Sequence, residues 1–393
     1  MSDQPSNKPT NKTSIHNLDD LRQRIDAVDD QIFELIYQRA RLAGQVGEFK
    51  QDQKNAPFYV PSREAKIIRR LLDRNQHLSE KSHESHIPDE AIHGIYREII
   101  GSCLALEHPM TIAFLGPEGT FTHTAATRQF GTSPNYLSCG NLAQVFDAVE
   151  AGRATYGVVP VENAFEGAVT HTMDLFADDD RDVLVCAEVQ LSIHHHLFSY
   201  AEKLEDIKVV ISHPQPLAQC RNWLQAHLPH AEQMEVASTV YAAEMIERAK
   251  SENPNNSIGH SAAAIGGYTI VDRSDLPLVQ KNIEDFHDNT TRFLVIGKHD
   301  SPPSGEDKTA LVLSIQDRAG ALNDVLASFA KRKVGLSRIE SRPSKKRLWE
   351  YVFLIDVQGH RDEKNVAEAL EEITAFEGIS VKLLGSYPVS RML

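Results

Sequence analysis

The sequence predicts a multidomain protein with an all-helical part, an α/β part and a ferredoxin-like part, in that order along 393 residues. Three patterns predict these parts. Apolar residues first recur at helical spacing, strand-like and helix-like segments then alternate after Pro109, and the tail follows the order βαββαβ. We therefore expect a disordered tail at residues 1–16 and domains at 17–108, 110–298 and 308–388.

The composition excludes several classes of protein. Basic residues number 41 against 55 acidic ones, and the net charge of −14 argues against nucleic acid as a partner, because backbone binding needs a basic face. No run approaches 18 apolar residues, so no membrane segment is predicted. The polar N-terminal residues include no apolar stretch, which favours a cytoplasmic protein. The four cysteines lack zinc-ligand spacing, so we expect free thiols. Neither a metal nor a cofactor is expected.

The helical part begins with one long helix. Its apolar residues run from Leu18 to Phe49 at spacings of three and four, and Asn17 suits the N-cap position. Two further helices are predicted from Pro61 and Pro88. The first helix, roughly 50 Å long at 1.5 Å per residue, has more apolar surface than two shorter neighbours can cover. A homodimer or a higher oligomer is therefore expected.

A basic residue interrupts the apolar stripe of this helix. Arg39 falls where Ile or Leu is expected, and a buried guanidinium needs an anionic partner, either a ligand or a carboxylate of the protein. Lys50 shares the face, about 16 Å further along the axis. Arg22 lies about 25 Å before Arg39 and is rotated by roughly 100°, so only a second chain brings it to the same site.

These residues carry a resemblance to the all-helical chorismate mutase family. The segments LRQRIDAVDDQIFELIYQRARLAGQVGEFK, PSREAKIIRRL and SCLALE resemble that family over residues 17 to 107. The resemblance implies that chorismate is rearranged to prephenate in an enzyme that holds the reactive conformer and stabilises charge on the ether oxygen. The implied binding residues are Arg22 of the second chain, Arg39, Lys50, Arg63, Glu64 and Glu107.

The resemblance also implies roles for these side chains. Two arginines grip the carboxylates, Lys50 and Glu107 donate to the ether oxygen, and Glu64 takes the ring hydroxyl. The sequence departs from some members of the family at three positions that are expected to contact the substrate. Glu107 stands where those members have Gln, Cys103 where they have Ser, and Val60 where they have Asp. A carboxyl group donates only when protonated, so a raised pKa is predicted for Glu107.

The α/β part contains four motifs that resemble prephenate dehydratase. They are GPEGTFTH (116–123), VVPVENAFEGAV (158–169), SHPQPLAQC (212–220) and TTRF (290–293), and they occur in the family's order. The resemblance implies two α/β lobes similar to a periplasmic binding protein, with the site in the cleft. It also implies the conversion of prephenate to phenylpyruvate.

Polar residues in these motifs follow strands, and open α/β sheets bind ligands at such strand ends. The candidates are Thr120, Thr122, Glu162, Asn163, Ser212, Gln215, Thr291 and Arg292. The resemblance implies that Thr291 is essential for loss of the hydroxyl and that Arg292 orients a carboxylate. Without the other motifs, TTRF would be read as a strand start with an ordinary surface arginine.

Two further stretches of the sequence have residue types that are common in ligand sites. The stretch FLGPEGTFTHTAA has the pattern of a strand, a turn and a helix whose N-terminus binds an anion. It lacks the Lys-Ser/Thr pair of a phosphate-binding loop, so a carboxylate is the favoured ligand. His194, His195 and His196 are consecutive. On a regular strand their side chains would alternate between faces, so a surface or partly packed run is predicted in place of a metal site.

The stretch SPPSGEDK (301–308) reads as a linker, and the tail beyond it resembles an ACT regulatory domain through AGAL (319–322) and IESRP (339–343). A glycine before a helix exposes backbone N–H groups to a ligand carboxylate. The resemblance implies L-phenylalanine as an allosteric inhibitor. The expected effector-binding residues are Gly320, Ala321, Leu322, Glu340, Ser341 and Arg342.

The favoured interpretation is a bifunctional enzyme that converts chorismate through prephenate to phenylpyruvate under feedback inhibition by L-phenylalanine. A non-catalytic solute-binding protein with a sensor tail is the alternative from another class. A narrower alternative is that the mutase site has decayed, because Val60 and Cys103 depart from the common pattern. The sequence leaves open the size of the oligomer, the channelling of prephenate, and any effect of tyrosine or tryptophan.

Overall fold

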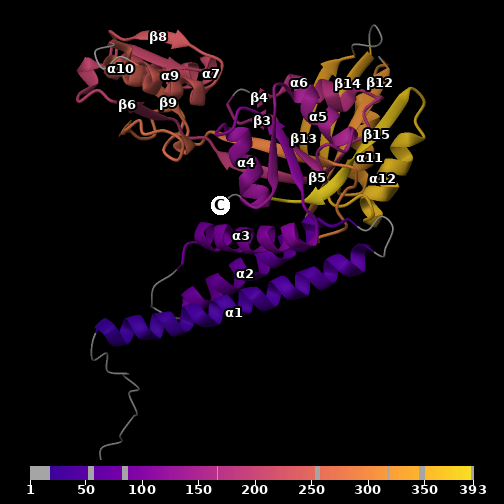
Figure 1. Cartoon of the computed structure of the whole chain (residues 1–393). Coiled ribbons are helices and arrows are strands. Elements are labelled where there is room, and N and C mark those ends of the chain that lie inside the picture. The colour runs from indigo at the N-terminus through magenta and orange to yellow at the C-terminus, as the bar shows by residue number, and fades with distance from the viewer. Residues whose placement is uncertain are drawn as a thin grey trace, which may run out of the picture. The chain divides into compact units, whose positions relative to one another are not determined.

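The computed structural model describes residues 18–51, 57–81, 87–165, 167–252, 257–316, 318–344 and 350–390 (Figure 1). The predicted disordered tail, 1–16, and the predicted N-cap Asn17 lie outside the described residues. The chain divides into two compact units, Met1–Ala56 and Pro57–Leu393, which are described separately. No helix in the described ranges is long and apolar enough to cross a membrane.

The described residues of the first unit, 18–51, form the helix α1 (Leu18–Gln51), which confirms the predicted long helix. Asp19 and Asp20 in its first turn and Lys50 in its last turn suit the helix dipole. Many of its apolar side chains are exposed: Leu18, Ile25, Val28, Ile32, Phe33, Leu35, Ile36, Tyr37, Leu42, Val46 and Phe49. An exposed apolar stripe of this length is typical of a surface that binds a partner.

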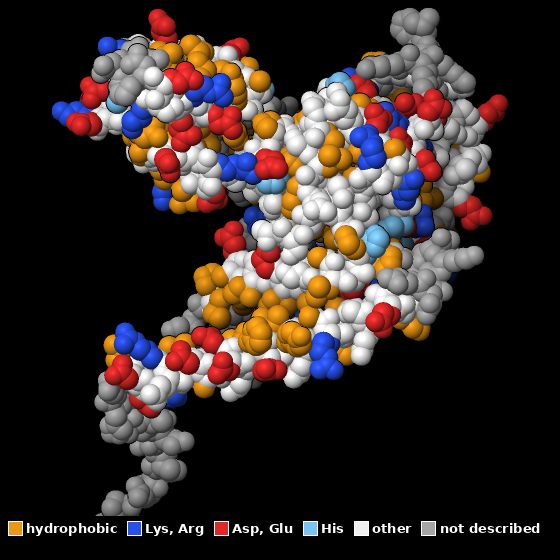
Figure 2. Space-filling view, in the orientation of Figure 1, with side chains coloured by type: hydrophobic (Ala, Val, Ile, Leu, Met, Phe, Trp, Pro, Cys, Tyr) orange, Lys and Arg blue, Asp and Glu red, His pale blue; other side chains and the backbone are white. Residues whose placement is uncertain are grey.

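The second unit begins with the helices α2 (Pro61–Lys81) and α3 (Asp89–Glu107). As predicted, a proline opens each of them, because proline suits the first positions of a helix. The two helices pack together through Ile68, Leu72 and Ile100. Over the α/β part of the second unit, Lys and Arg side chains are interspersed with Asp and Glu in the space-filling view (Figure 2).

His93 on α3 provides a pH-dependent contribution to stability. Burial, Arg97 and Arg128 lower its pKa from the ordinary value near 6.5 to about 4. The folded protein therefore binds this proton more weakly than the unfolded chain, so stability is retained above pH 6.5 and lost as the pH falls toward 4. Because the side chain is partly exposed, we expect a loss of only about 1 kcal/mol at pH 5. Melting temperatures between pH 7 and pH 5 measure it.

The variant His93→Gln should lose less stability over this pH range than the wild type. His77→Gln, at an exposed position on α2, is the matched control and should follow the wild-type curve. Parallel curves for all three proteins would contradict the assignment to His93.

Helix α2 is attached to the segment that follows the α/β part. The amide of Ser62 donates to Ser301 Oγ at 3.0 Å, Lys66 Nζ donates to the carbonyl of Pro303 at 3.0 Å, and Arg69 donates to Ser304 Oγ at 3.3 Å. The predicted linker 301–308 is therefore packed, and Ser301 and Ser304 are buried. The Gly and Pro signals identified a connection but gave no information about its contacts.

The α/β part contains two sheets, as the resemblance implied. The first has the order β2-β1-β3-β11-β5, with β4 beside β3. Strands β1, β2 and β3 are parallel, whereas β11 is antiparallel to both of its neighbours. Its elements are β1 (Thr111–Leu115), α4 (Phe121–Phe130), β2 (Asn135–Cys139), α5 (Leu142–Glu150), β3 (Tyr156–Asn163), β4 (Gly167–Ala168), α6 (Thr170–Ala177), β5 (Leu184–Ser192) and β11 (Thr290–Gly297).

The second sheet has the order β10-β6-β9-β7-β8 and its own cores. The chain enters it after β5 and returns through β11, so this lobe is inserted into the first. The stretch PQPLAQCRNWLQAHL (214–228) has the sequence pattern of one helix, but in the structure it is divided at Cys220 into two helices. The elements are β6 (His196–Ser199), η1 (Leu204–Asp206), β7 (Val209–Ser212), α7 (Pro214–Gln219), α8 (Arg221–His227), β8 (Glu232–Glu235), α9 (Thr239–Glu252), α10 (Ser257–Ser261), β9 (Ala262–Gly266), η2 (Tyr268–Ile270) and β10 (Leu278–Gln280).

The C-terminal part confirms the predicted βαββαβ order. Its sheet has the order β13-β14-β12-β15, so β13 and β15 are edge strands. The elements are β12 (Asp307–Gln316), α11 (Ala321–Lys331), β13 (Leu336–Pro343), β14 (Glu350–Gln358), α12 (Lys364–Thr374) and β15 (Ile379–Pro388).

Each face of the C-terminal sheet packs against another layer of the protein. One face packs against α11 and α12 through a core that includes Phe329 and Ile373. The other face shares a core with the first sheet of the α/β part, in which Val312 and Leu354 meet Val159. A Cβ atom at Gly385 would collide with the backbone of β5, so the two sheets approach closely at this residue. The C-terminal part is thus joined to the α/β part by a continuous apolar core.

Candidate active site

A cavity of about 620 Å³ is lined by residues of both lobes of the α/β part. Its walls come from the β1–α4 turn, the ends of β3 and β11, the β5–β6 connection, and the turns that follow β7 and β8. Five residues predicted from the sequence line it: Thr120, Thr122, Asn163, Gln215 and Thr291. The expectation that these motifs meet in a cleft agrees with this geometry.

Thr291 and Asn163 lie side by side on two adjacent strands. They are register partners on β11 and β3, and Asn163 Nδ2 donates to Thr291 Oγ1 at 2.8 Å. A hydroxyl that accepts from an amide still has its own hydrogen to donate. Thr291 is therefore oriented as a hydrogen-bond donor toward a ligand in the cavity.

A chain of buried polar groups continues from this pair. Asn163 Nδ2 also donates to Asn289 Oδ1 at 2.8 Å, and Asn289 Nδ2 donates to Gln219 Oε1 at 3.1 Å. His195 Nε2 donates to the same Gln219 oxygen, at 2.6 Å. This series of hydrogen bonds orients Thr291 through Asn163. It extends to His195 and Gln219, which also line the cavity.

Three residues of this hydrogen-bonded series were not predicted from the sequence. Gln219 lies within the motif SHPQPLAQC, whose predicted site residues are Ser212 and Gln215, and Asn289 lies immediately before TTRF. His195 belongs to the histidine run, for which regular strand geometry predicts no shared ligand site. In the structure His194 and His195 lie between β5 and β6. His194 is partly exposed, whereas His195 and His196 are buried, so the run is partly packed, as predicted.

Each of the three histidines bonds to protein groups. His194 Nδ1 contacts Glu284 Oε1 at 2.8 Å, and His196 Nδ1 accepts from the amide of Asn282 at 3.1 Å. Within the described ranges, no group of three or more His, Cys, Asp and Glu side chains has the arrangement of a metal site.

The β1–α4 turn lies at the cavity wall. Thr120 is the N-cap of α4, where its Oγ1 accepts from the amide of His123 at 3.4 Å. Gly119 has a φ of +84°, a conformation that favours glycine. Thr269 Oγ1 of the second lobe donates to the carbonyl of Gly119 at 2.7 Å, and Arg273 pairs with Glu118 at 2.6 Å. These two contacts join the lobes beside the cavity.

Ser212 does not line the cavity. It is fully buried, and its Oγ donates to the carbonyl of Ile265 at 2.7 Å, which ties β7 to β9. The prediction that Ser212 binds substrate is therefore corrected to a structural role. Ser212 is the last residue of β7 and its side chain points into the protein, whereas Gln215 on the following helix lines the cavity.

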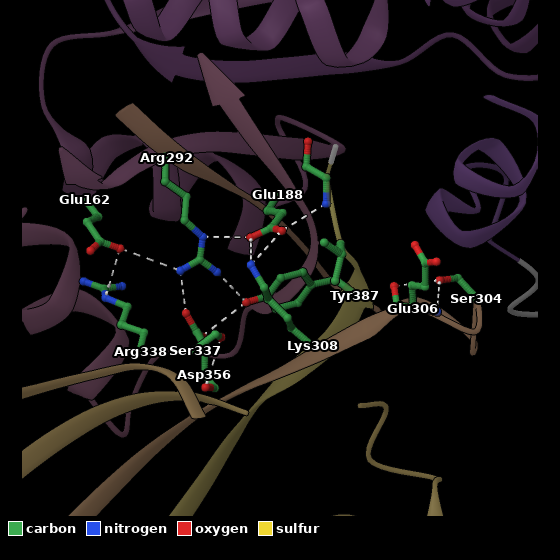
Figure 3. A network of polar contacts seen from close by, with 12 residues as sticks. Glu162, Glu188, Arg292, Ser304, Glu306, Lys308, Ser337, Arg338, Asp356 and Tyr387 are labelled. Carbon is green, nitrogen blue, oxygen red and sulfur yellow. Dashed lines mark hydrogen bonds and ion pairs between the residues drawn. The ribbon is translucent and has the colours of Figure 1, made fainter. Parts of the chain in front are cut away.

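Glu162 and Arg292 are also corrected. They are register partners next to Asn163 and Thr291, and successive side chains of a strand point to opposite faces. Figure 3 shows both side chains in a polar network with the C-terminal part. Arg292 donates to Glu188 at 2.8 Å and to Asp356 at 2.5 Å. The expectation that these two residues contact the substrate is wrong for this arrangement, because neither lines the cavity.

The predicted mutase residues fall in both compact units. Arg22, Arg39 and Lys50 lie on α1, where Arg22 is exposed and pairs with Asp19 at 3.4 Å. The remaining predicted residues belong to the second unit, and their assembly with α1 into one site stays a prediction. Those residues are Val60, before α2, Arg63 and Glu64 on α2, and Cys103 and Glu107 on α3.

Glu64 forms a buried ion pair that the sequence did not predict. Its carboxylate bonds to Arg97 of α3, and both side chains are about 90% buried. Both residues also line a small cavity of about 80 Å³, to which Gln129 and Glu188 of the α/β part contribute. The proposed role of Glu64 toward a ring hydroxyl stays a prediction.

The predicted effector residues lie on two elements. Gly320 is the N-cap of α11 with a φ of +85°, and Ala321 and Leu322 form the first turn of that helix. Glu340, Ser341 and Arg342 lie on the edge strand β13. Arg342 reaches Asp174 of the α/β part at 3.8 Å. The binding of an effector by these residues stays a prediction.

Three family models match the chain in order: chorismate mutase type II at residues 21–108, prephenate dehydratase at 112–301 and the ACT domain at 309–375. The bifunctional chorismate mutase/prephenate dehydratase of Aquifex aeolicus is 42% identical over 377 residues, covering 94% of this chain and 98% of that protein. Its namesake from Pseudomonas aeruginosa is 42% identical over 373 residues, covering 94% and 96%.

Solved structures match the second and third parts. Prephenate dehydratase of Arthrobacter aurescens in complex with L-Phe is 34% identical, covers 71% of this chain and 90% of that chain, and has a TM-score of 0.63. GqqA, a quorum quenching acylase, is 27% identical, covers 71% and 98%, and has a TM-score of 0.61. One fold can host different chemistries, so the assignment of function rests on the full-length relatives and the family models.

Proposed function

The chain belongs to the bifunctional chorismate mutase/prephenate dehydratase family, and from this premise we propose which residues carry out its two reactions. The protein is an enzyme of phenylalanine biosynthesis that rearranges chorismate to prephenate and then dehydrates and decarboxylates prephenate to phenylpyruvate. One observation carries the assignment of the dehydratase residues: the Thr291–Asn163 pair at the wall of a cavity formed by both lobes.

The dehydratase reaction requires two bonds to break across the prephenate ring. The bond to the ring carboxylate breaks with release of CO₂, its electron pair enters the ring, and the hydroxyl on the opposite carbon takes a proton and leaves as water. A donor placed at that hydroxyl stabilises the charge developing on the leaving oxygen. Thr291, held by Asn163, is the proposed donor.

The rest of the cavity suits the remaining groups of prephenate. The apolar side chains of Phe121, Ile193 and Phe293 line the wall and favour loss of charge from the ring carboxylate. The N-terminus of α4, with Thr120 and Thr122, is the proposed site for the side-chain carboxylate, because the first turn of a helix presents unpaired N–H groups.

The assay that tests the function uses the purified full-length chain. Consumption of chorismate and formation of phenylpyruvate are measured with and without L-phenylalanine. We expect both activities in the absence of the amino acid and a reduced dehydratase rate in its presence. Loss of chorismate without formation of phenylpyruvate would overturn the dehydratase assignment.

The mutase proposal makes Glu107 a donor to the ether oxygen of chorismate. Because a carboxyl group donates only when protonated, the wild-type mutase rate should fall about tenfold per pH unit once this group ionises. Glu107→Gln keeps a donor at every pH, so its rate should stay level over the same range. Mutase rates measured from pH 5 to pH 9 make the comparison. Identical decline in both proteins would remove Glu107 from this role.

The regulatory proposal assigns L-phenylalanine to the ACT domain. The A. aurescens dehydratase, whose structure was solved in complex with L-Phe, supports this ligand. We further propose a cytoplasmic homodimer or higher oligomer, in which the exposed apolar stripe of α1 is covered by a second copy. Arg22 of that copy would then complete the mutase site.

A further inference from the structure

Strand β11 connects the dehydratase cavity to the ACT sheet. Its residue Thr291 lines the cavity, whereas the next residue, Arg292, points to the opposite face, and its side chain is only 11% exposed. Strand β3 repeats the arrangement, with Asn163 at the cavity and Glu162 on the other face. Each member of the Thr291–Asn163 pair is thus adjacent in sequence to a charged residue behind the sheet.

On the face of the sheet away from the cavity, Arg292 forms hydrogen bonds with residues of the ACT strands (Figure 3). Its guanidinium donates to Asp356 of β14 at 2.5 Å and to Tyr387 Oη of β15 at 2.8 Å. Tyr387 Oη donates in turn to Asp356 at 3.2 Å. Burial raises the pKa of Tyr387, so the phenol stays protonated and keeps this role as a donor. All the nitrogens of the Arg292 side chain therefore contact residues behind the sheet, with Glu188 as the third partner.

Two register pairs face each other across the domain boundary. Arg292 and Glu162 are partners in the dehydratase sheet, and Arg338 and Asp356 are partners in the ACT sheet. Between the sheets Arg292 pairs with Asp356 at 2.5 Å, and Arg338 pairs with Glu162 at 3.6 Å. Each domain thus contributes one cation and one anion, and we name these four residues the charge square.

The charge square is balanced, and most of it is buried. Lys308 and Glu188 add one further charge of each sign and pair at 2.9 Å. Removing one member of such a group leaves an uncompensated charge in a poorly solvated site, which is strongly destabilising. The position of the ACT strands is thereby linked to the position of β3 and β11.

The square also lies close in sequence to the proposed effector residues. Arg338 is on β13, the strand that carries Glu340 and Ser341, and its guanidinium additionally donates to the carbonyl of Val161 at 3.1 Å. The contact between Arg338 and Glu162 therefore links β13 directly to the neighbour of Asn163.

We propose that Arg292 and Glu162 are positioning residues for Thr291 and Asn163, and that the ACT residues Asp356 and Arg338 set their position. The effector would then act on the dehydratase through the charge square, an inference that rests on the proposed regulation by L-phenylalanine.

The variant Asp356→Asn in the full-length chain tests this inference. We expect the dehydratase kcat to fall roughly threefold to tenfold with an unchanged KM for prephenate, because the donor is misplaced while the cavity is intact. The L-phenylalanine concentration for half inhibition should rise by about tenfold, whereas calorimetry should show that the amino acid still binds. Mutase activity, measured on the same sample, should be unchanged.

Two further variants separate positioning from general destabilisation. Arg338→Gln should weaken inhibition as Asp356→Asn does, and Arg338→Lys, which keeps the charge, should retain most of it. Glu372→Gln is the matched control, because it removes a carboxylate from an ion pair with Arg332 inside the ACT domain. It should leave both kcat and inhibition at wild-type values.

Two outcomes would overturn the inference: wild-type kcat and inhibition in both Asp356→Asn and Arg338→Gln, or mutase and dehydratase activities that fall in parallel. If calorimetry shows no binding of L-phenylalanine to the wild type, the proposed effector is wrong. In that case the ratio of dehydratase kcat between Asp356→Asn and Glu372→Gln still decides the positioning role.

Discussion

Thr291→Ala is expected to reduce prephenate turnover by at least about 100-fold, because it removes the hydroxyl proposed to stabilise the leaving oxygen. The mutase rate of the same protein should be unchanged, since Thr291 belongs to the α/β part and lies in its cavity. Separate assays with chorismate and with prephenate measure the two rates.

Thr290→Ala is the matched control for this variant. Thr290 precedes Thr291 on β11 and does not line the cavity, so its substitution should cost little dehydratase activity. Retention of prephenate turnover in Thr291→Ala, or an equal loss in both variants, would remove Thr291 from the reaction.

Arg97→Met is expected to destabilise the helical pair α2–α3 by about 3–5 kcal/mol, because it leaves the buried Glu64 carboxylate without its cation. Urea unfolding, followed by the loss of helical signal and of mutase activity, measures the change.

The double variant Glu64→Gln with Arg97→Met provides the control. Removing both charges should restore part of the stability lost in Arg97→Met, because no unpaired ion is left in the interior. A double variant that is less stable than Arg97→Met would show that the ion pair is not the cause. Mutase activity should fall in the double variant if Glu64 contacts the substrate.

Much of the secondary structure could be predicted from local signals. Pro61 and Pro88 identified the starts of two helices, and period-two and helical patterns identified the order βαββαβ. Such signals depend on neighbours within a few residues. The division of the helix at Cys220 and the packing of the segment 301–308 depend on contacts with distant parts of the chain, which no local pattern encodes.

The candidate site shows the same limit at the level of side chains. The motifs identified Thr291 and Asn163, but they grouped them with Arg292 and Glu162, which point the other way. The alternation of side chains along a strand places the two pairs on opposite faces of the sheet. Which pair faces the cavity, however, depends on which face packs against the C-terminal sheet. The partners Asp356 and Arg338 come from a domain that begins after the motif ends, so the charge square could not be read from the motifs.

The insertion of one lobe into the other has a consequence for synthesis of the chain. Strand β11 lies between β3 and β5 in the first sheet, yet it follows both of them and the whole second lobe in the sequence. Until Gly297 has left the ribosome, β11 cannot pair with β3 and β5, and these two strands are not connected in the sheet. The nascent enzyme therefore exposes two unpaired strand edges while about a hundred further residues are translated, a period in which aggregation or chaperone binding is favoured.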